Sequence, residues 1–314
     1  MRKLLLRSNT QISMLTVHIP RPILHATCLF IFYVSVGGAA QAQQSCSVPL
    51  APRIPSGDQI FSIPNERILG DIESKWVESN YHPDHDEQLE DHLNAIAAKV
   101  LLQVTQDQSP VRVILIDTPD AESFSTGPER IYISRKMVGL LRNDDELAGL
   151  VGHELGHILM HQNALIVSQL FHGILGINAV SDREDISEKL RRMLESIDRD
   201  TKLQRKASQI MQKQEAILQN EADRVALYAS AAAGYSPQAY VDLFDRSAGT
   251  NGSNGNILTD FFGSTTSNLR RLREIKKTLK QLPRPCREIA PVVSEEFLTW
   301  QAEVISGQDL ACRR

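Results

Sequence analysis

The sequence lacks a strong net charge, an internal repeat and, after its first residues, a long hydrophobic run. Its 314 residues carry a formal net charge of -4, which gives no overall attraction to nucleic acid or to an acidic membrane surface. The apolar stretch 164–180 is broken by polar residues and glycines, so we expect a core or lid segment rather than a membrane span there. The composition is that of an ordinary globular chain with room for one large domain.

Residues 1–42 have the pattern of a secretory signal peptide. A basic start precedes an apolar run from Ile23 to Val36, and Ala40-Gln41-Ala42 then predicts cleavage before Gln43. An uncleaved anchor is the alternative, although the run is short for a span. We therefore expect export to the periplasm or the extracellular space, with no membrane association required.

Cysteine is also scarce, with four in the chain. Cleavage of the signal would leave Cys46, Cys286 and Cys312 in an oxidising compartment, where a disulfide can form. We prefer the pair Cys286 and Cys312, because both lie in the C-terminal tail. Two alternatives stay open: a disulfide from Cys46 to either of them, or three free thiols.

The pattern after the signal predicts an α+β fold, mainly helical, with a small sheet before the helix at 143–161. Residues 43–64 are expected to be an irregular lead-in, residues 65–280 the main domain and residues 281–314 a tail. The first regular elements are a helix, two strands and a short helix, expected at 86–105, 111–117, 131–134 and 137–141.

The second half of the chain is expected to be helical. The charged stretch 182–206 indicates an exposed helix or pair of helices, and a long helix from Ala207 to Ala233 ends at Gly234. The run 247–256 has the composition of a loop. A basic helix then follows from Leu269 to Leu279.

The richest stretch contains His153-Glu154-Leu155-Gly156-His157, called the HELGH motif below. Residues four apart lie on one helix face, so His153 and His157 can place two imidazole nitrogens on one metal ion. Glu154 lies about 100° round the helix, where a metallopeptidase needs a carboxylate to take a proton from water. The alternative is a buried helix whose histidines only bond to backbone.

The sequence around the motif supports a real helix. Asn143 can cap its start, Glu146 stands where a capping box has its glutamate, and Asp144 and Asp145 suit the positive end of the helix dipole. Apolar residues then recur at helical spacing through the motif. The motif therefore lies on a helix that buries one face.

Three segments together resemble the HtpX and BepA group of zinc peptidases, gluzincins related to the CaaX prenyl protease. They are DDELAGLVGHELGHI, the preceding PERIYIS and the later NEADRVALYASAAAGYSPQAYVDLF. The resemblance implies one zinc ion per chain, bound by His153 and His157, with Glu154 as general base. It also implies that Asp223 orients a zinc-binding histidine, and that the strand of Ile131, Tyr132, Ile133 and Ser134 pairs with an extended substrate.

The sequence departs from this family at the third zinc ligand. The family has a glutamate four residues before Asp223, where this chain has Gln219. Glu221 is a carboxylate, but it lies about 200° round a regular helix from Gln219. Three alternatives stay open. Gln219 binds the metal through its amide oxygen, or a distorted helix brings Glu221 to the metal, or the metal site is weakened or lost. Glu221 is taken as the provisional ligand.

Three further positions bear on the site. Glu215 lies one turn too early, and His161, one turn after His157, is a further ligand candidate or an exposed residue. Where the family carries Thr-His-Pro, this chain has Thr265-Thr266-Ser267, so the sequence offers no residue to stabilise an oxyanion.

These features predict a zinc-dependent endopeptidase of a bacterial envelope that acts in protein quality control on unfolded or misassembled proteins. The alternative is an impaired relative that binds client proteins as a chaperone or assembly factor. Gln219 and Thr266 support that alternative, whereas the retained HELGH motif and Asp223 argue against it. A purely structural metal site is weaker, because structural zinc normally has four protein ligands.

Overall fold

We analysed the protein in a computed structural model, which describes residues 46–47, 59–83, 86–104, 110–247, 269–295 and 297–302. The expected signal peptide, the loop after Ser247, the segment Thr265-Thr266-Ser267 and Cys312 lie outside these residues. Among the helices described, none is both long and apolar enough to cross a membrane.

The helix of the HELGH motif is α5 (Asp144–Leu159), and it begins as the sequence predicts. Oδ1 of Asn143 accepts a hydrogen bond from the backbone N–H of Glu146 at 2.9 Å. The carboxylate of Glu146 reaches back to the N–H of Arg142, one residue before the position expected for a capping box. These bonds satisfy amide groups that would otherwise lack partners at the helix start.

A four-stranded sheet precedes α5, in the order β1-β2-β4-β3. Its strands are β1 (His82–Pro83), β2 (Arg112–Asp117), β3 (Ser123–Thr126) and β4 (Arg130–Ser134). β2 and β4 are parallel, whereas β1 and β3 run antiparallel to their neighbours. The two strands expected from the sequence are confirmed, whereas β1 and β3 were not expected.

The position of β4 corrects one expectation. β4 has hydrogen-bonded neighbours on both sides, β2 and β3, so the strand Ile131–Ser134 is not available as the edge that pairs with a substrate. The edge strand on the α5 side is β3, which contacts that helix.

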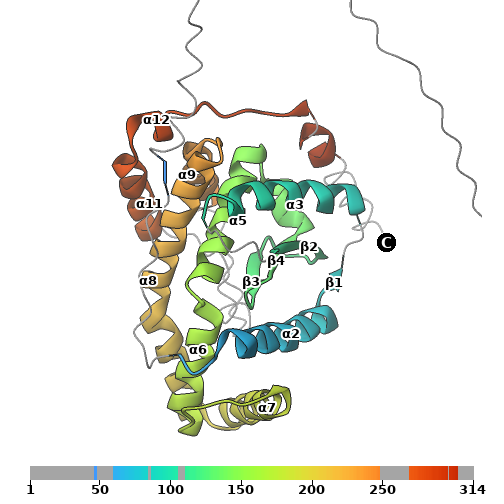
Figure 1. Cartoon of the computed structure of the whole chain (residues 1–314), viewed down its shortest axis with the longest axis vertical. Helices are drawn as coiled ribbons and strands as arrows, with labels where there is room; N and C mark the ends of the chain where they lie inside the picture. Colours follow the sequence, from blue (N-terminus) through green and yellow to red (C-terminus); the bar gives the residue numbers. More distant parts are fainter. Residues whose placement is uncertain are drawn as a thin grey trace, which may run out of the picture. The chain divides into compact units, whose positions relative to one another are not determined.

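Alternate residues of the strands face two different layers. Val113, Leu115, Ile131 and Ile133 pack in the core that α5 shares with α3 (Glu87–Leu101). Ile116, Phe124 and Tyr132 pack on the other face with Val77 of α2 (Ile63–Asn80). Figure 1 shows α2 and α3 on opposite sides of the strands. Helix α2 was not expected, and it begins inside the stretch that the sequence marked as irregular.

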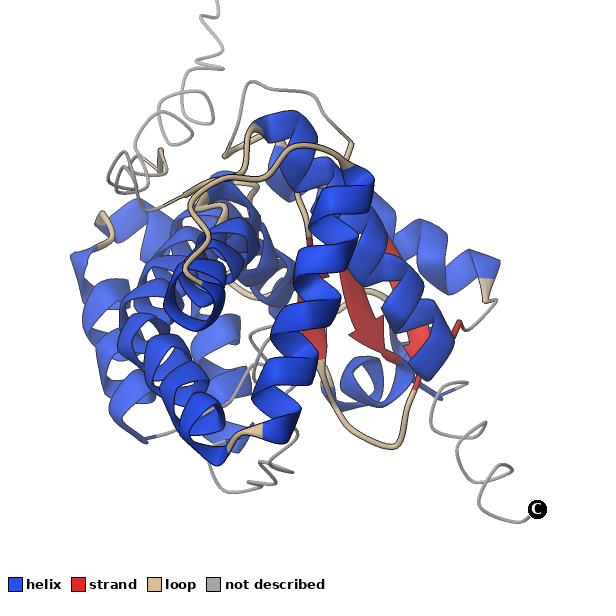
Figure 2. Ribbon diagram, turned by 90° about the horizontal axis from the view of Figure 1, so that it is seen from below, coloured by secondary structure: helices blue, strands red, loops and turns tan. Residues whose placement is uncertain are grey.

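The remaining helices include those expected at 137–141, 182–206, 207–233 and 269–279, with shifted ends, and further ones. They are α4 (Arg135–Leu140), α6 (Gln162–Leu170) continuing into the π-helix η1 (Phe171–Leu175), α7 (Arg183–Arg199), α8 (Thr201–Ala232), α9 (Pro237–Ser247), α11 (Leu269–Gln281) and α12 (Arg284–Arg287). Helices surround the sheet in Figure 2. The fold is therefore α+β and mainly helical, as predicted.

Helices α5 and α8 lie unusually close together because of two glycines one turn apart. A Cβ atom on Gly156 would stand 2.7 Å from Cα of Ala222, and one on Gly152 would stand 3.0 Å from Cα of Ala226. These distances are too short for a side chain, so only glycine permits this approach. The contact places the Gln219–Asp223 turn of α8 against the HELGH motif.

One disulfide connects an N-terminal residue of the described chain to its C-terminal part. Cys46 is bonded to Cys286 of α12, with their Cα atoms 5.7 Å apart. Both cysteines are buried in one hydrophobic cluster with residues of α8, α9 and α11. The preferred pairing of Cys286 with Cys312 was therefore wrong, because tertiary packing brings together residues 240 positions apart.

Candidate active site

His153 and His157 point at each other from successive turns of α5. Their Nε2 atoms are 2.9 Å apart, and both side chains are buried. Two nitrogens bound to one tetrahedral zinc ion at about 2.0–2.1 Å would be about 3.3 Å apart. The pair is thus close to the spacing that a shared metal ion requires.

The other ring nitrogen of His153 contacts a carboxylate on α8. Nδ1 of His153 lies 3.0 Å from Oδ1 of Asp223, which is the contact that the resemblance implied. Tyr240 of α9 donates its hydroxyl hydrogen bond to the same oxygen at 2.7 Å. Asp223 is therefore fixed from two sides, and such a partner sets the tautomer and orientation of a metal-binding imidazole.

Arg271 of α11 completes this buried network. Its Nε donates to Oδ2 of Asp223 at 2.8 Å and its Nη2 to Oδ1 at 2.6 Å. Nη2 also lies 3.1 Å from Nε2 of His153. Arg271 was not predicted from the sequence. Its helical spacing from Ile275 and Leu279, which are buried on the same face, is the signal that could have indicated it.

The network favours neutral imidazoles and an ionised aspartate. Burial lowers the pKa of His153, and the charge of Arg271 lowers it further. Burial also lowers the pKa of His157 well below its ordinary value. For Asp223, burial raises the pKa, but Arg271 and His153 outweigh it and hold the pKa far below its usual range. Neutral imidazole is the form that binds metals.

Glu154 is completely buried beside the histidine pair, and β3 holds it. The hydroxyl of Ser123 donates to Oε1 of Glu154 at 2.7 Å. This bond fixes the carboxylate on the side of α5 that faces the edge strand. Ser123 was also missed from the sequence, because nothing predicted a strand at 123–126.

The structure separates the two candidates for the third metal ligand. Glu221 turns away from the histidines and binds Arg224, with Oε2 accepting from Nη2 at 2.6 Å, because α8 is one helix from Thr201 to Ala232. This contact argues against the provisional choice of Glu221. Gln219 is buried, and Oε1 of its amide has no hydrogen bond of normal geometry with any residue that the structure describes. Its effect on the pKa of His153, which opposes that of burial, places it beside that ring.

These observations decide whether the residues fit a metal ion. No group of three His, Cys, Asp or Glu side chains within the described ranges is arranged to hold one. Two facing imidazoles and a buried amide oxygen without a hydrogen bond nevertheless form a three-donor set, and an amide oxygen is an acceptable, weaker ligand than a carboxylate. The residues therefore fit a zinc ion held by His153, His157 and Gln219.

His161 is not part of this donor set. It adopts a left-handed backbone conformation with φ 51° after the end of α5, so its side chain turns from the motif to Glu66 of α2. Nδ1 of His161 lies 2.7 Å from Oε2 of Glu66. The side chain of Glu215 lies outside the described residues.

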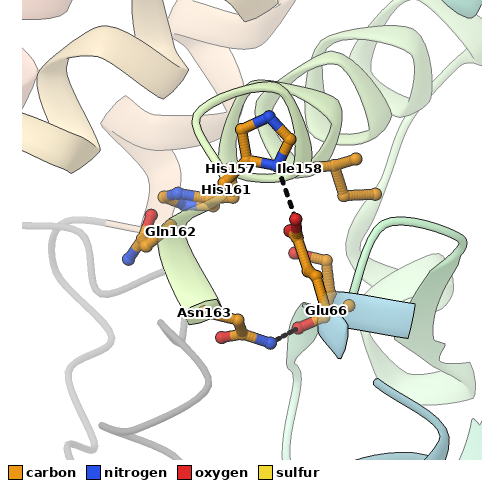
Figure 3. A pocket seen from close by; sticks show the side chains of 8 residues that line it. Glu66, His157, Ile158, His161, Gln162 and Asn163 are labelled. Atoms are coloured by element: carbon orange, nitrogen blue, oxygen red, sulfur yellow. Dashed lines mark hydrogen bonds and ion pairs between the residues drawn. The ribbon is translucent and has the colours of Figure 1, made fainter. Parts of the chain in front are cut away.

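A small pocket opens at the C-terminal end of α5. Its wall includes His157, His161, Gln162, Asn163 and Glu66, which Figure 3 shows around a common space with the bond between His161 and Glu66. Asn163 closes one side, since its Nδ2 donates to the backbone oxygen of Ser125 in β3 at 3.2 Å. The pocket thus connects the second histidine of the motif with the end of the edge strand.

A helix with two histidines one turn apart and a glutamate beside them, next to a small sheet, is the arrangement of a class of metallopeptidases. Comparison with family models agrees, since the model of Peptidase family M48 matches residues 83–279. The chain belongs to this family, whose members are generally zinc-dependent and include relatives of HtpX and the CaaX protease. Comparison with curated proteins gives no match.

Proposed function

We propose that the protein is a zinc-dependent endopeptidase of the bacterial cell envelope that cleaves unfolded or misassembled proteins. The observation that carries the proposal is the buried pair His153 and His157, whose Nε2 atoms face each other at 2.9 Å with the Glu154 carboxylate beside them. Export follows from the signal-peptide pattern of residues 1–42, and the quality-control role from resemblance.

His153, His157 and Gln219 would hold the zinc ion. When bound, zinc supplies a Lewis acid that activates a water molecule and polarises the peptide carbonyl. Asp223 orients His153 through the 3.0 Å contact to Nδ1. Three donors without a carboxylate among them give a weaker site than the family's usual set, so we expect the zinc to be more easily removed by chelators.

Glu154 acts as the general base. Its carboxylate accepts a proton from the attacking water and delivers it to the leaving amine. Ser123 holds Oε1 through its hydroxyl, so the orientation of the base depends on β3. The hydrogen bond thus keeps the carboxylate in the rotamer that proton transfer requires.

We propose that an extended substrate pairs with β3 along its outer edge. The backbone oxygen of Glu122 accepts from the N–H of Ser134 in β4. Since antiparallel residues alternate between the two sides, Ser123 and Ser125 present their backbone groups away from β4. The oxygen of Ser125 already accepts from Asn163, so substrate pairing would use Ser123 and the N–H of Ser125. An extended polypeptide added there would pass Glu154 and the histidines, which is the β-augmentation mode of peptide recognition.

Hydrolysis of an unfolded protein such as casein tests the proposal. We expect the zinc-loaded mature chain to cleave it, a chelator to stop cleavage and zinc to restore it, and Glu154→Gln to retain zinc but lose activity by at least about 100-fold. Glu188→Gln, on the exposed face of α7, is the matched control and should keep activity. Cleavage that persists in Glu154→Gln would refute the proposal.

One observation favours a second function, that of a client-binding chaperone without catalysis. The guanidinium of Arg271 stands 3.1 Å from Nε2 of His153, and a cation there opposes metal binding. Under this alternative the zinc-treated chain suppresses aggregation of an unfolded protein without cleaving it, and Glu154→Gln suppresses it equally well. Loss of full-length casein with the unmodified chain would exclude it.

A further inference from the structure

The two histidines of the motif differ in how their outer ring nitrogen is held. Nδ1 of His153 contacts Asp223, whereas Nδ1 of His157 is buried and has no partner that meets normal hydrogen-bond limits within the described part of the chain. A buried ring nitrogen without a partner costs free energy, and metal-binding histidines almost always bond through this atom. His157 therefore needs an acceptor close by.

Gln162 supplies an acceptor atom that is itself unsatisfied. It is buried, it lines the same pocket as His157, and its amide oxygen Oε1 also has no hydrogen bond of normal geometry. Burial is the main cause that lowers the pKa of His157, and Gln162 opposes that effect as a hydrogen-bonding neighbour. The two side chains thus line one small space, and Figure 3 shows both with their labels.

The turn between α5 and α6 is what brings Gln162 back to His157. Gln162 is the first residue of α6 and directly follows His161, whose φ of 51° reverses the chain. That conformation is uncommon for a residue other than glycine, and the 2.7 Å bond from His161 to Glu66 holds it in place. Glu66 in turn sits where it does because Gly70 of α2 packs directly on Gly127.

We propose that Gln162 is a positioning residue for the metal site, its amide oxygen accepting a hydrogen bond from Nδ1–H of His157. This bond leaves Nε2 of His157 unprotonated and facing Nε2 of His153, as a zinc ligand must be. Gln162 then does for His157 what Asp223 does for His153. The inference rests on the proposed function, because it assigns a role toward the zinc ion that His153, His157 and Gln219 would share.

Zinc affinity of the mature chain, measured by competition with a chelator, tests the role. Gln162→Leu keeps the side-chain volume but removes the acceptor, and we expect it to weaken zinc binding by about 10- to 100-fold. Gln162→Glu keeps an oxygen at the same place and should bind zinc at least as tightly as the unmodified chain. Gln169→Leu removes the same amide two turns later on α6 and should leave zinc affinity unchanged.

Stability of the metal-free chain separates positioning from packing. In the presence of chelator, Gln162→Leu should unfold at a slightly lower denaturant concentration than the unmodified chain, because Nδ1–H of His157 loses its acceptor, but it should be fully folded where zinc affinity is measured. A Gln162→Leu chain that is partly unfolded without denaturant would make Gln162 a packing residue and overturn the inference. So would zinc affinity that is unchanged in Gln162→Leu while the unmodified chain binds one zinc. If the unmodified chain binds no zinc, the proposed function itself fails, and this inference fails with it.

Discussion

Nη2 of Arg271 lies 2.6 Å from Oδ1 of Asp223 and 3.1 Å from Nε2 of His153, so one guanidinium contacts both the imidazole and the carboxylate behind it. The charge of Asp223 raises the pKa of Arg271 against the effect of burial. The ion pair is buried, and the carboxylate of Asp223 offsets the positive charge that the guanidinium brings beside His153, the proposed zinc ligand. It also connects α11 to α8.

Breaking this pair should cost much of the protein's stability. Arg271→Met leaves the carboxylate of Asp223 buried without its main partner, and we expect the free energy of unfolding to fall by about 3–5 kcal/mol. In the double variant Arg271→Met, Asp223→Asn the loss should be smaller than the sum of the single losses, since no charge is left buried. Denaturant unfolding in the presence of chelator measures this, and additive losses would show that the two residues do not act as a pair.

The close approach of α5 and α8 depends on Gly156. In Gly156→Ala the new Cβ meets backbone of Ala222 at 2.7 Å, so the helices must separate, at a cost of about 1–3 kcal/mol. Zinc affinity should fall as well, because the separation moves Gln219 and Asp223 away from His153. Gly173→Ala is the control, since its Cβ meets only the flexible side chains of Ile210 and Lys206 and no backbone. Equal effects of the two substitutions would contradict this account.

Glu73 of α2 should make the protein less stable as the pH rises. Burial raises the pKa of Glu73 to about 8, and the charge of Glu66 adds to the effect. Between the ordinary pKa of 4.5 and the raised pKa of about 8, the unfolded chain has released this proton while the folded chain retains it, so the free energy of unfolding falls with pH through this window.

Glu73→Gln should remove that pH dependence. Below pH 4.5 we expect little difference from the unmodified chain, and at pH 8 to 9 the variant should be more stable by a few kcal/mol at most. Urea unfolding across pH 4 to 9 measures the difference. Glu78→Gln, on an exposed position of the same helix, should show none. A stability gap for Glu73→Gln that is constant with pH would contradict the raised pKa.

What the sequence predicted well was encoded locally. The cap at Asn143 and the apolar spacing through Leu155 define α5 within one stretch of sequence. Helical periodicity alone predicted that Asp223 and Gln219 share one face of α8 and that Glu221 lies on another. The same periodicity explains why the structure finds Glu221 bound to Arg224. A regular α-helix predicts that Glu221 faces away from Gln219, and the provisional choice of Glu221 as the ligand required that helix to be distorted.

The features that the sequence did not predict depend on contacts between distant segments. Helix α2 buries two carboxylates, Glu66 and Glu73, on its inner face, so its apolar pattern is weak. β3 reads Ser-Phe-Ser-Thr and becomes a strand only by pairing with β4. Arg271 and Cys286 meet partners 48 and 240 residues earlier in the chain, and no local pattern indicates such a pairing.

The central claim is that His153, His157 and Gln219 form the metal site, and zinc titration by calorimetry tests it most directly. We predict one zinc per unmodified chain, weaker binding for Gln219→Leu, tighter binding for Gln219→Glu, which restores a carboxylate, and unchanged binding for the control Glu221→Gln. Loss of zinc in Glu221→Gln with full binding in Gln219→Leu would contradict the account.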